Sequence, residues 1–296
     1  MTDLSANDIT GRTGLICILG SPVAHSISPA MHNCAFRSLG LDYVYLAFDV
    51  GRDGLRAAVD GLRAVGARGW NVTMPDKNLM AEYCDRLSPA SQLTGAVNTV
   101  VNDDGVLTGY TTDGIGYMEA ARQAGFELGG KTMTVLGAGG AAAAVVTQAA
   151  LDGLRQIRVF NRVSGSSGSY QRMQKLAASI EAVSSCRVSV QDLADERALA
   201  DSIGSSDILV NTTSVGMTPN EDACLIKDRD LLRKDLIVSD IIYSPDRTRL
   251  LEMAAGSGCR VFNGLYMLLY QGAASFRLWT GCDMPTELIK EKCFRR

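Results

Sequence analysis

Two ionisable side chains in the first half of the chain could move a proton to or from a bound molecule. Lys77 closes a short polar segment, Asn71-Val-Thr73-Met-Pro75-Asp-Lys77, and Asp113 follows Thr112 ahead of an expected helix over Gly114–Ala124. An amine and a carboxylate can donate, accept or hold a proton during a reaction. Each also has a structural interpretation, since Lys77 could be solvated and Thr112 or Asp113 could cap the helix. Together they form one ionisable pair able to move a proton.

Further polar side chains accompany this pair at the ends of apolar runs. Ser26 and Ser28 follow the first run, Asn71 and Thr73 the third, and Asn98 lies in the fourth. Ligands of parallel sheets bind outside the carboxyl ends of the strands, so these positions favour one site. Hydroxyls and amides beside one amine and one carboxylate suit a small polyhydroxylated acid. Singly, Ser28 could cap a helix and Asn98 could bond the backbone.

The second half of the chain carries a glycine cluster between two expected strands. The segment is Lys131-Thr-Met-Thr-Val-Leu-Gly137-Ala138-Gly139-Gly140-Ala141-Ala142, and a second apolar run ends at Asn161-Arg162. Gly137 permits a tight turn, Gly139 lets the backbone approach a pyrophosphate, and a small residue at 142 allows close packing. The free N–H groups of the helix start then face the phosphates. This pattern predicts dinucleotide binding, with Arg162 offering a cation to a 2′-phosphate.

The elements that must position these residues alternate between strand and helix. Strands are expected over 15–19, 43–50, 70–74 and 96–101, helices over 29–39 and 55–65, and a second series of strands begins at Lys131 and continues near 157, 188, 208 and 237. Such alternation predicts an α/β fold with mostly parallel sheets flanked by helices. The serine- and glycine-rich stretch over 164–169 is expected to be a flexible loop at the adenosine end of the cofactor site.

Length and composition exclude several classes of protein. A chain of 296 residues suggests two domains, and a net charge of −3 argues against a nucleic-acid-binding protein. Eight cysteines form no CxxC pair and only two histidines are present, so no metal site is expected. Free thiols suit a reducing cytosol, and no signal peptide is visible. The longest apolar tract, over 265–279, is too short and too polar for a membrane span.

The motifs, taken in order, resemble the shikimate dehydrogenase family over nearly the whole chain. They are Gly20-Ser-Pro22-Val-Ala-His25-Ser26-Ile-Ser28-Pro29 with Met31-His32-Asn33, Asn71-Val-Thr73-Met-Pro75-Asp-Lys77, Gly95-Ala-Val-Asn98-Thr99, Gly109-Tyr-Thr-Thr112-Asp113-Gly114, the glycine cluster, Asn161-Arg162, Asn211-Thr-Thr-Ser-Val-Gly216-Met217, Asp240-Ile-Ile-Tyr243-Ser-Pro245 and Gly264-Leu-Tyr-Met267-Leu-Leu-Tyr-Gln271. Segments 101–105, 193–195 and 279–281 resemble the quinate/shikimate dehydrogenase branch more closely.

The resemblance implies reversible, nicotinamide-dependent reduction of 3-dehydroshikimate to shikimate, a step toward chorismate and the aromatic amino acids. The quinate branch also oxidises quinate to 3-dehydroquinate. The resemblance assigns catalysis to Lys77 and Asp113. It implies that substrate is bound by Ser26, Ser28, Asn71, Thr73, Asn98, Tyr243 and Gln271. It places the cofactor, NADP or NAD, on Gly137, Ala138, Gly139, Gly140, Ala141, Asn161, Arg162, Thr213, Val215, Met217, Gly264 and Met267.

The family's organisation implies three parts. Residues 1–112 are expected to bind substrate, 113–263 to form a Rossmann-like NAD(P)-binding domain, and 264–296 to return as helix to the first domain with Gln271. The expected partner is a small-molecule substrate, with no nucleic acid and no membrane, in a cytoplasmic monomer or homodimer.

A few positions depart from the family pattern. Asp76 places a second carboxylate beside Lys77, where it either changes the proton affinity of the amine or points to solvent. Arg162 is followed by Val163, without the acid common in the NAD-using branch. Two rival functions remain open on the residues alone. A methyltransferase would favour an acid where Asn161-Arg162 stands, and a non-catalytic dinucleotide sensor would need no proton-transfer pair.

Overall fold

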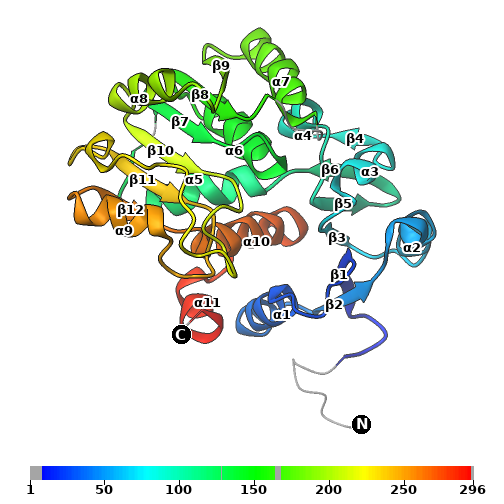
Figure 1. Cartoon of the computed structure of the whole chain (residues 1–296). Coiled ribbons are helices and arrows are strands. Elements are labelled where there is room, and N and C mark those ends of the chain that lie inside the picture. The colour runs from blue at the N-terminus through cyan, green and yellow to red at the C-terminus, as the bar shows by residue number, and fades with distance from the viewer. Residues whose placement is uncertain (1–8, 128, 164–167, 295–296) are drawn as a thin grey trace. The chain divides into compact units, whose positions relative to one another are not determined.

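The structure of the chain is a computed structural model that describes residues 9–127, 129–163 and 168–294. The chain divides into two compact units (Figure 1). Unit 1 is Met1–Thr112 with Gln271–Arg296, and unit 2 is Asp113–Tyr270. Helix α10 (Leu265–Thr280) therefore begins in unit 2 and continues in unit 1. Residues 164–167 of the expected flexible loop lie outside the described residues.

Unit 1 is built on a mixed sheet of order β2-β1-β3-β5-β6-β4. Its strands are β1 (Gly14–Gly20), β2 (Tyr43–Asp49), β3 (Gly69–Val72), β4 (Arg86–Leu87), β5 (Thr99–Asp103) and β6 (Val106–Tyr110). Its helices are α1 (Ser28–Leu39), η1 (Arg52–Gly54), α2 (Leu55–Ala64), α3 (Lys77–Glu82), α4 (Pro89–Thr94), α11 (Thr286–Cys293) and the latter part of α10. The helix expected over 55–65 is α2, whose Leu55, Val59 and Leu62 are buried against the sheet.

The expectation of mostly parallel strands is wrong for part of this sheet. Strand β5 runs antiparallel to both β3 and β6, and Asn71 lies opposite Thr99. The fourth strand also begins at Thr99, so Asn98 precedes it. An antiparallel strand starts at the edge where its neighbour ends. Asn98 therefore reaches the same edge as Asn71 from the amino end of its strand and not from the carboxyl end.

Unit 2 is a parallel sheet of order β12-β11-β10-β7-β8-β9 flanked by helices. Its strands are β7 (Thr132–Leu136), β8 (Gln156–Asn161), β9 (Arg187–Asp192), β10 (Ile208–Asn211), β11 (Ile237–Asp240) and β12 (Arg260–Phe262). Its helices are α5 (Asp113–Gln123), α6 (Gly140–Leu151), α7 (Ser169–Val183), α8 (Glu196–Gly204), η2 (Arg229–Leu231) and α9 (Arg249–Gly256). Strands β7, β8 and β9 follow one another toward one edge of the sheet, and β10, β11 and β12 follow one another toward the other edge. Doubly wound folds bind nucleotides at the point between the two series, here between β7 and β10.

Close packing of two helices explains why the residue after the predicted catalytic Asp113 is a glycine, Gly114. Helices α5 and α6 lie against each other (Figure 1). A Cβ on Gly114 would overlap the carbonyl oxygen of Ala144 in α6. Gly114 therefore serves packing within unit 2, and Asp113 is the first residue of the helix that this packing fixes.

Candidate functional site

The predicted substrate-binding amides of unit 1 belong to one hydrogen-bonded network. Tyr45 donates its phenolic hydroxyl to Oδ1 of Asn71 at 2.7 Å. Asn71 in turn donates through Nδ2 to the Asn98 carbonyl and to the Thr99 hydroxyl, both at 3.0 Å. Asn71 and Asn98 are buried, with exposed fractions of 5% and 3%. A buried amide must be satisfied, so these bonds fix the orientation of Asn71.

The second half of the network reaches the C-terminal helix α10. Asn98 accepts a hydrogen bond from the Thr112 backbone at 2.8 Å and donates to the Thr112 hydroxyl at 3.0 Å. It also donates to Oε1 of Gln271 at 3.3 Å. Ser275, one turn beyond Gln271, bonds the Thr99 hydroxyl at 2.7 Å. Two residues of α10 are thereby joined to the edge of the sheet where β3 ends.

Sequence reasoning missed part of this network. Tyr45 and Ser275 were not expected at the site, and Thr99 was quoted only within a motif. Ser275 lies four residues after Gln271, so both side chains lie on one face of the helix. That spacing was a usable signal. Tyr45 gave none, because an aromatic residue within a strand reads as core.

Two predicted serines lie where the first strand turns into α1. The alternative role of Ser28 as a helix cap is wrong, because the N-cap position is Ile27 and Ser28 is the first helical residue. The Ser28 backbone N–H donates to the Ser26 hydroxyl at 3.3 Å, and the Ser28 side chain hydrogen-bonds Tyr45. Ser28 is therefore joined through Tyr45 to Asn71. Thr73 follows the end of β3 and donates its N–H to the Leu19 carbonyl at 3.0 Å.

The predicted catalytic pair is divided between the units. Lys77 is the first residue of α3 in unit 1, and Asp113 is the first residue of α5 in unit 2. Their pairing stays a prediction. Asp76 does not point to solvent, because it is only 1% exposed. Among the described residues, neither of its carboxylate oxygens has a hydrogen-bond partner.

The glycine turn of unit 2 has the geometry that phosphate binding requires. Gly137 has φ +104°, and a Cβ there would lie 2.7 Å from Cγ2 of Thr213. Gly139 precedes α6 in extended conformation, and a Cβ on Gly139 or Gly140 would meet nothing within 4 Å. Ala142, at the third fingerprint position, is fully buried. The open surface at a helix N-terminus fits a dinucleotide pyrophosphate. Ala138 and Ala141 flank these glycines.

The adjoining strand β8 ends at the predicted ribose-binding residues. The Asn161 side chain donates to the Ser169 hydroxyl at 3.0 Å, which ties the start of α7 to the end of β8. Arg162 is exposed. Arg172 lies in the first turn of α7, and its Nη1 is 3.3 Å from the position of a Cβ on Gly168. A second cation, Arg172, therefore belongs to the helix that begins beside Asn161.

The remaining predicted cofactor residues lie on the loop after β10 and at the start of α10. Thr213, Val215 and Met217 follow β10, whereas Tyr243, a predicted substrate-binding residue, follows β11. Met217 and Tyr243 are 44% and 43% exposed, so both are available to a ligand. Gly264 precedes α10, donates its N–H to the Ile242 carbonyl at 3.1 Å, and leaves no room for a Cβ beside the Ile241 carbonyl. Met267 is in the first turn of α10.

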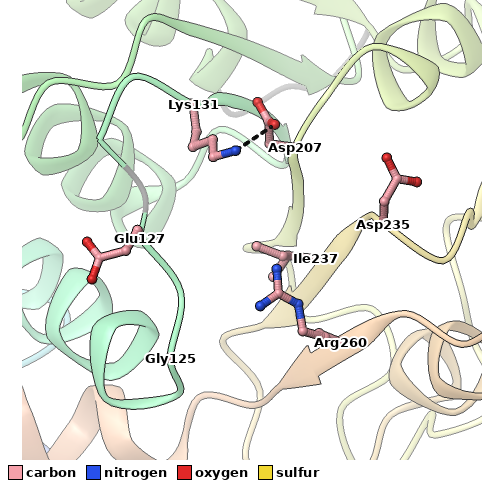
Figure 2. Close-up of a pocket in the computed structure, with 7 residues that line it drawn as sticks. All are labelled: Gly125, Glu127, Lys131, Asp207, Asp235, Ile237 and Arg260. Atoms are coloured by element: carbon pink, nitrogen blue, oxygen red, sulfur yellow. Dashed lines mark hydrogen bonds and ion pairs between the residues drawn. The ribbon is translucent and has the colours of Figure 1, made fainter.

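A cavity of about 260 Å³ lies at the opposite, amino edge of the same sheet. Figure 2 shows Lys131 directed toward Asp207 within it, with Arg260 below them. Lys131, Asp207 and Arg260 stand at the starts of β7, β10 and β12, away from the glycine turn. The cavity is therefore separate from the predicted cofactor site.

Within 9–127, 129–163 and 168–294, no cluster of three His, Cys, Asp or Glu side chains could hold a metal ion. Over the same residues, no helix is long and apolar enough to cross a membrane.

Comparison with known proteins gives a consistent result. The shikimate dehydrogenase substrate-binding domain model matches residues 18–100, and the shikimate 5'-dehydrogenase C-terminal domain model matches residues 264–294. A protein of Listeria monocytogenes serotype 4b named shikimate dehydrogenase (NADP(+)) is 50% identical over 99% of this chain and 100% of its own length.

A second curated relative belongs to the branch that the sequence motifs favoured. The quinate/shikimate dehydrogenase of Escherichia coli O17:K52:H18 is 44% identical over 96% of this chain and 98% of its own. Among solved structures, shikimate 5-dehydrogenase from Listeria monocytogenes in complex with shikimate and NAD has a TM-score of 0.92 and 51% identity. That match covers 96% of this chain and 97% of the other.

Proposed function

The chain belongs to the shikimate dehydrogenase family, and we propose that unit 1 binds the substrate while unit 2 binds the nicotinamide cofactor. The enzyme interconverts shikimate and 3-dehydroshikimate with NADP or NAD. The observation that carries the assignment of the units is the division of polar groups between them. The amide and hydroxyl network lies in unit 1, and the open glycine turn at a helix start lies in unit 2.

In this proposal the substrate carboxylate binds the hydroxyls of Ser26 and Ser28. The ring hydroxyls bind Asn71, Thr73, Asn98 and Gln271, with Tyr243 contributing from unit 2. Neutral donors and acceptors held by a buried network are already oriented, so little ordering is needed on binding. A chain of hydrogen bonds through Ser28, Tyr45, Asn71, Asn98 and Gln271 links the carboxylate-binding end to the hydroxyl-binding end.

Catalysis rests on Lys77 and Asp113. The cofactor, when bound, supplies or accepts the hydride. As the ketone is reduced, negative charge grows on its oxygen, and the Lys77 ammonium stabilises that charge and donates the proton. Asp113 orients the amine and accepts a hydrogen bond from the neighbouring substrate hydroxyl. In the oxidative direction Lys77 takes the proton back.

Quinate is the second candidate substrate. The relationship to a protein named quinate/shikimate dehydrogenase favours it, as do segments 101–105, 193–195 and 279–281. We further propose a cytoplasmic enzyme, because all eight cysteines are free and free thiols suit a reducing compartment. The proposed assembly is a monomer or a homodimer. Steady-state turnover of shikimate and quinate with NADP and NAD tests the proposal. Absence of reduced nicotinamide with either acid would favour a non-catalytic sensor.

Cofactor selectivity gives one prediction. We expect NADP and NAD to differ only modestly in kcat/KM, because Arg162 is exposed and an exposed ion pair contributes about 0–1 kcal/mol. Arg162→Ala should then reduce use of NADP more than use of NAD. Arg172→Ala is the companion variant, since it reports whether the second cation contributes. A thousandfold preference of the unmodified enzyme for either cofactor would contradict the prediction.

Gln271 gives another prediction. Gln271→Leu should raise the KM for shikimate about tenfold through loss of one hydrogen bond to a substrate hydroxyl. The melting temperature of the free enzyme should stay nearly unchanged, because the contacts that Oε1 accepts from Asn98 and Thr112 are long, at 3.3 and 3.5 Å. Ser275→Ala serves as the comparison on the same helix face. A destabilised enzyme with normal kinetics would make Gln271 a structural amide only.

A further inference from the structure

Asp240 carries a buried carboxylate at the carboxyl end of β11 that the reaction does not use. The residue is 1% exposed. Its Oδ2 accepts hydrogen bonds from Nδ2 of Asn211 at 3.1 Å and from the Thr248 hydroxyl at 2.8 Å. Its Oδ1 accepts one from the Ile242 backbone at 3.0 Å. All three partners are donors, so the site demands a group that only accepts.

The first donor, Asn211, controls the loop that follows β10. Its Nδ2 also donates to the Val215 carbonyl at 3.2 Å. Its Oδ1 accepts from the Thr213 backbone at 3.1 Å and the Thr213 hydroxyl at 2.7 Å. Because Asp240 accepts from Nδ2, it determines which way the Asn211 amide faces. Reversal of that amide would break the contacts to both Thr213 and Val215.

The other two donors control the segments on either side of Tyr243. The Thr248 hydroxyl, which donates to Asp240, also accepts from the Leu251 N–H and so caps α9. The Ile242 N–H is fixed by Asp240, and the Ile242 carbonyl accepts from the Gly264 N–H at 3.1 Å. One carboxylate thus joins the loop after β10, the segment that leads to Tyr243, and the start of α9.

We propose that Asp240, as the carboxylate, is a positioning residue for nicotinamide-cofactor binding. It touches neither substrate nor cofactor, and acts through Asn211 on the loop that carries Thr213 and Val215. The proposal rests on the assignment of that loop to the cofactor. An uncharged group at position 240 that presents a donor would face an N–H or O–H of one partner. The Asn211 amide would then turn, and the Thr213 loop would lose its fixed conformation.

Protonation of Asp240 has the same consequence as replacing its carboxylate by an amide, because either change places a donor opposite the donors of its partners. Burial raises the pKa of Asp240 from 3.8 to about 6, although its three donors lower it. The Cys224 thiol lies near Asp240: burial raises the pKa of that thiol, Asp240 also raises it, and Arg249 lowers it. The cofactor KM of the unmodified enzyme should therefore rise as pH falls through 6.

The effect on folding runs in the opposite direction. A folded-state pKa above the unfolded value means that Asp240 stabilises the fold below pH 3.8 and that this contribution is lost as pH rises through about 6. Weaker cofactor binding at lower pH would thus not come from Asp240-linked unfolding. This separates a positioning role from a merely structural one.

The test compares Asp240→Asn with Asp207→Asn. Asp207 lies before β10 at the opposite edge of the same sheet (Figure 2), where it accepts from the Thr132 N–H and hydroxyl, each at 2.8 Å. Asp240→Asn should raise the KM and the calorimetric Kd for NADP about tenfold, as expected for losing a hydrogen bond to a charged group. The kcat at saturating cofactor and the KM for shikimate should change less than about twofold. Asp207→Asn should leave all of these constants unchanged.

The pH profile provides a readout that needs no variant. The KM for NADP of the unmodified enzyme should rise between pH 7.5 and 5.5, and that rise should be absent in Asp240→Asn. Equal effects of the two substitutions, or a flat profile in the unmodified enzyme, would overturn the proposal. Absence of any shikimate turnover by the unmodified enzyme would instead refute the proposed function.

Discussion

Replacing Lys77 by alanine should lower kcat by about two to four orders of magnitude, the range for losing a positioned proton donor. The KM for shikimate should change far less, because the amine acts mainly as charge develops on the ketone oxygen. Initial rates of shikimate oxidation over a range of shikimate concentrations, with saturating NADP, measure both constants.

Lys131→Ala is the matched control for this substitution. Lys131 is an exposed lysine at the amino edge of the unit 2 sheet, where its ammonium lies 3.3 Å from Oδ1 of Asp207. Lys131→Ala should leave kcat unchanged, because Lys131 lies away from the proposed site. It should also leave stability nearly unchanged, because exposed ion pairs contribute little to stability. A Lys77→Ala enzyme with nearly normal kcat and a greatly raised KM would show that Lys77 binds substrate without taking part in proton transfer.

Gly139→Ala should weaken NADP binding by about one to two orders of magnitude while leaving the melting temperature unchanged, because it removes the close backbone approach to phosphate. The backbone at Gly139 is extended, with φ −80° and ψ −172°, so alanine can adopt it. An added Cβ would meet no protein atom within 4 Å. Calorimetric titration with NADP and a thermal melt of the free enzyme measure the two quantities.

Gly204→Ala is the control for a methyl group added in open space. A Cβ at Gly204, the last residue of α8, would also meet nothing within 4 Å. It should change neither NADP affinity nor the KM for NADP. Unchanged NADP affinity in Gly139→Ala would show that the phosphates bind elsewhere and would remove the glycine turn from the cofactor site.

The alternation of apolar runs was enough to predict an α/β fold, and it succeeded most fully in unit 2. There every paired strand is parallel, and the glycine turn follows β7 as expected. The failure came at β5, which is antiparallel to its neighbours. Apolar periodicity reports which side chains are buried and does not report strand direction. Asn98 was nevertheless placed at the correct edge of the sheet.

The site was predictable where a polar residue interrupted an apolar pattern. Gln271 stood out within an apolar helix for that reason, as did Asn71 and Asn98 at strand ends. Tyr45 could not be recognised, because a tyrosine in a strand suggests core, and the sequence alone could not decide whether Asp76 points to solvent. Only the three-dimensional packing shows that Asp76 is buried and that Tyr45 donates to Asn71.

A crystal structure of the enzyme with shikimate and NADP tests the central claim most directly. The account predicts the shikimate carboxylate on the hydroxyls of Ser26 and Ser28, its ring hydroxyls on Asn71, Asn98 and Gln271, and the pyrophosphate over Gly139. The Lys77 ammonium should lie within hydrogen-bonding distance of the hydroxyl that is oxidised. Shikimate bound away from the amide network, or Lys77 directed away from that hydroxyl, would contradict it.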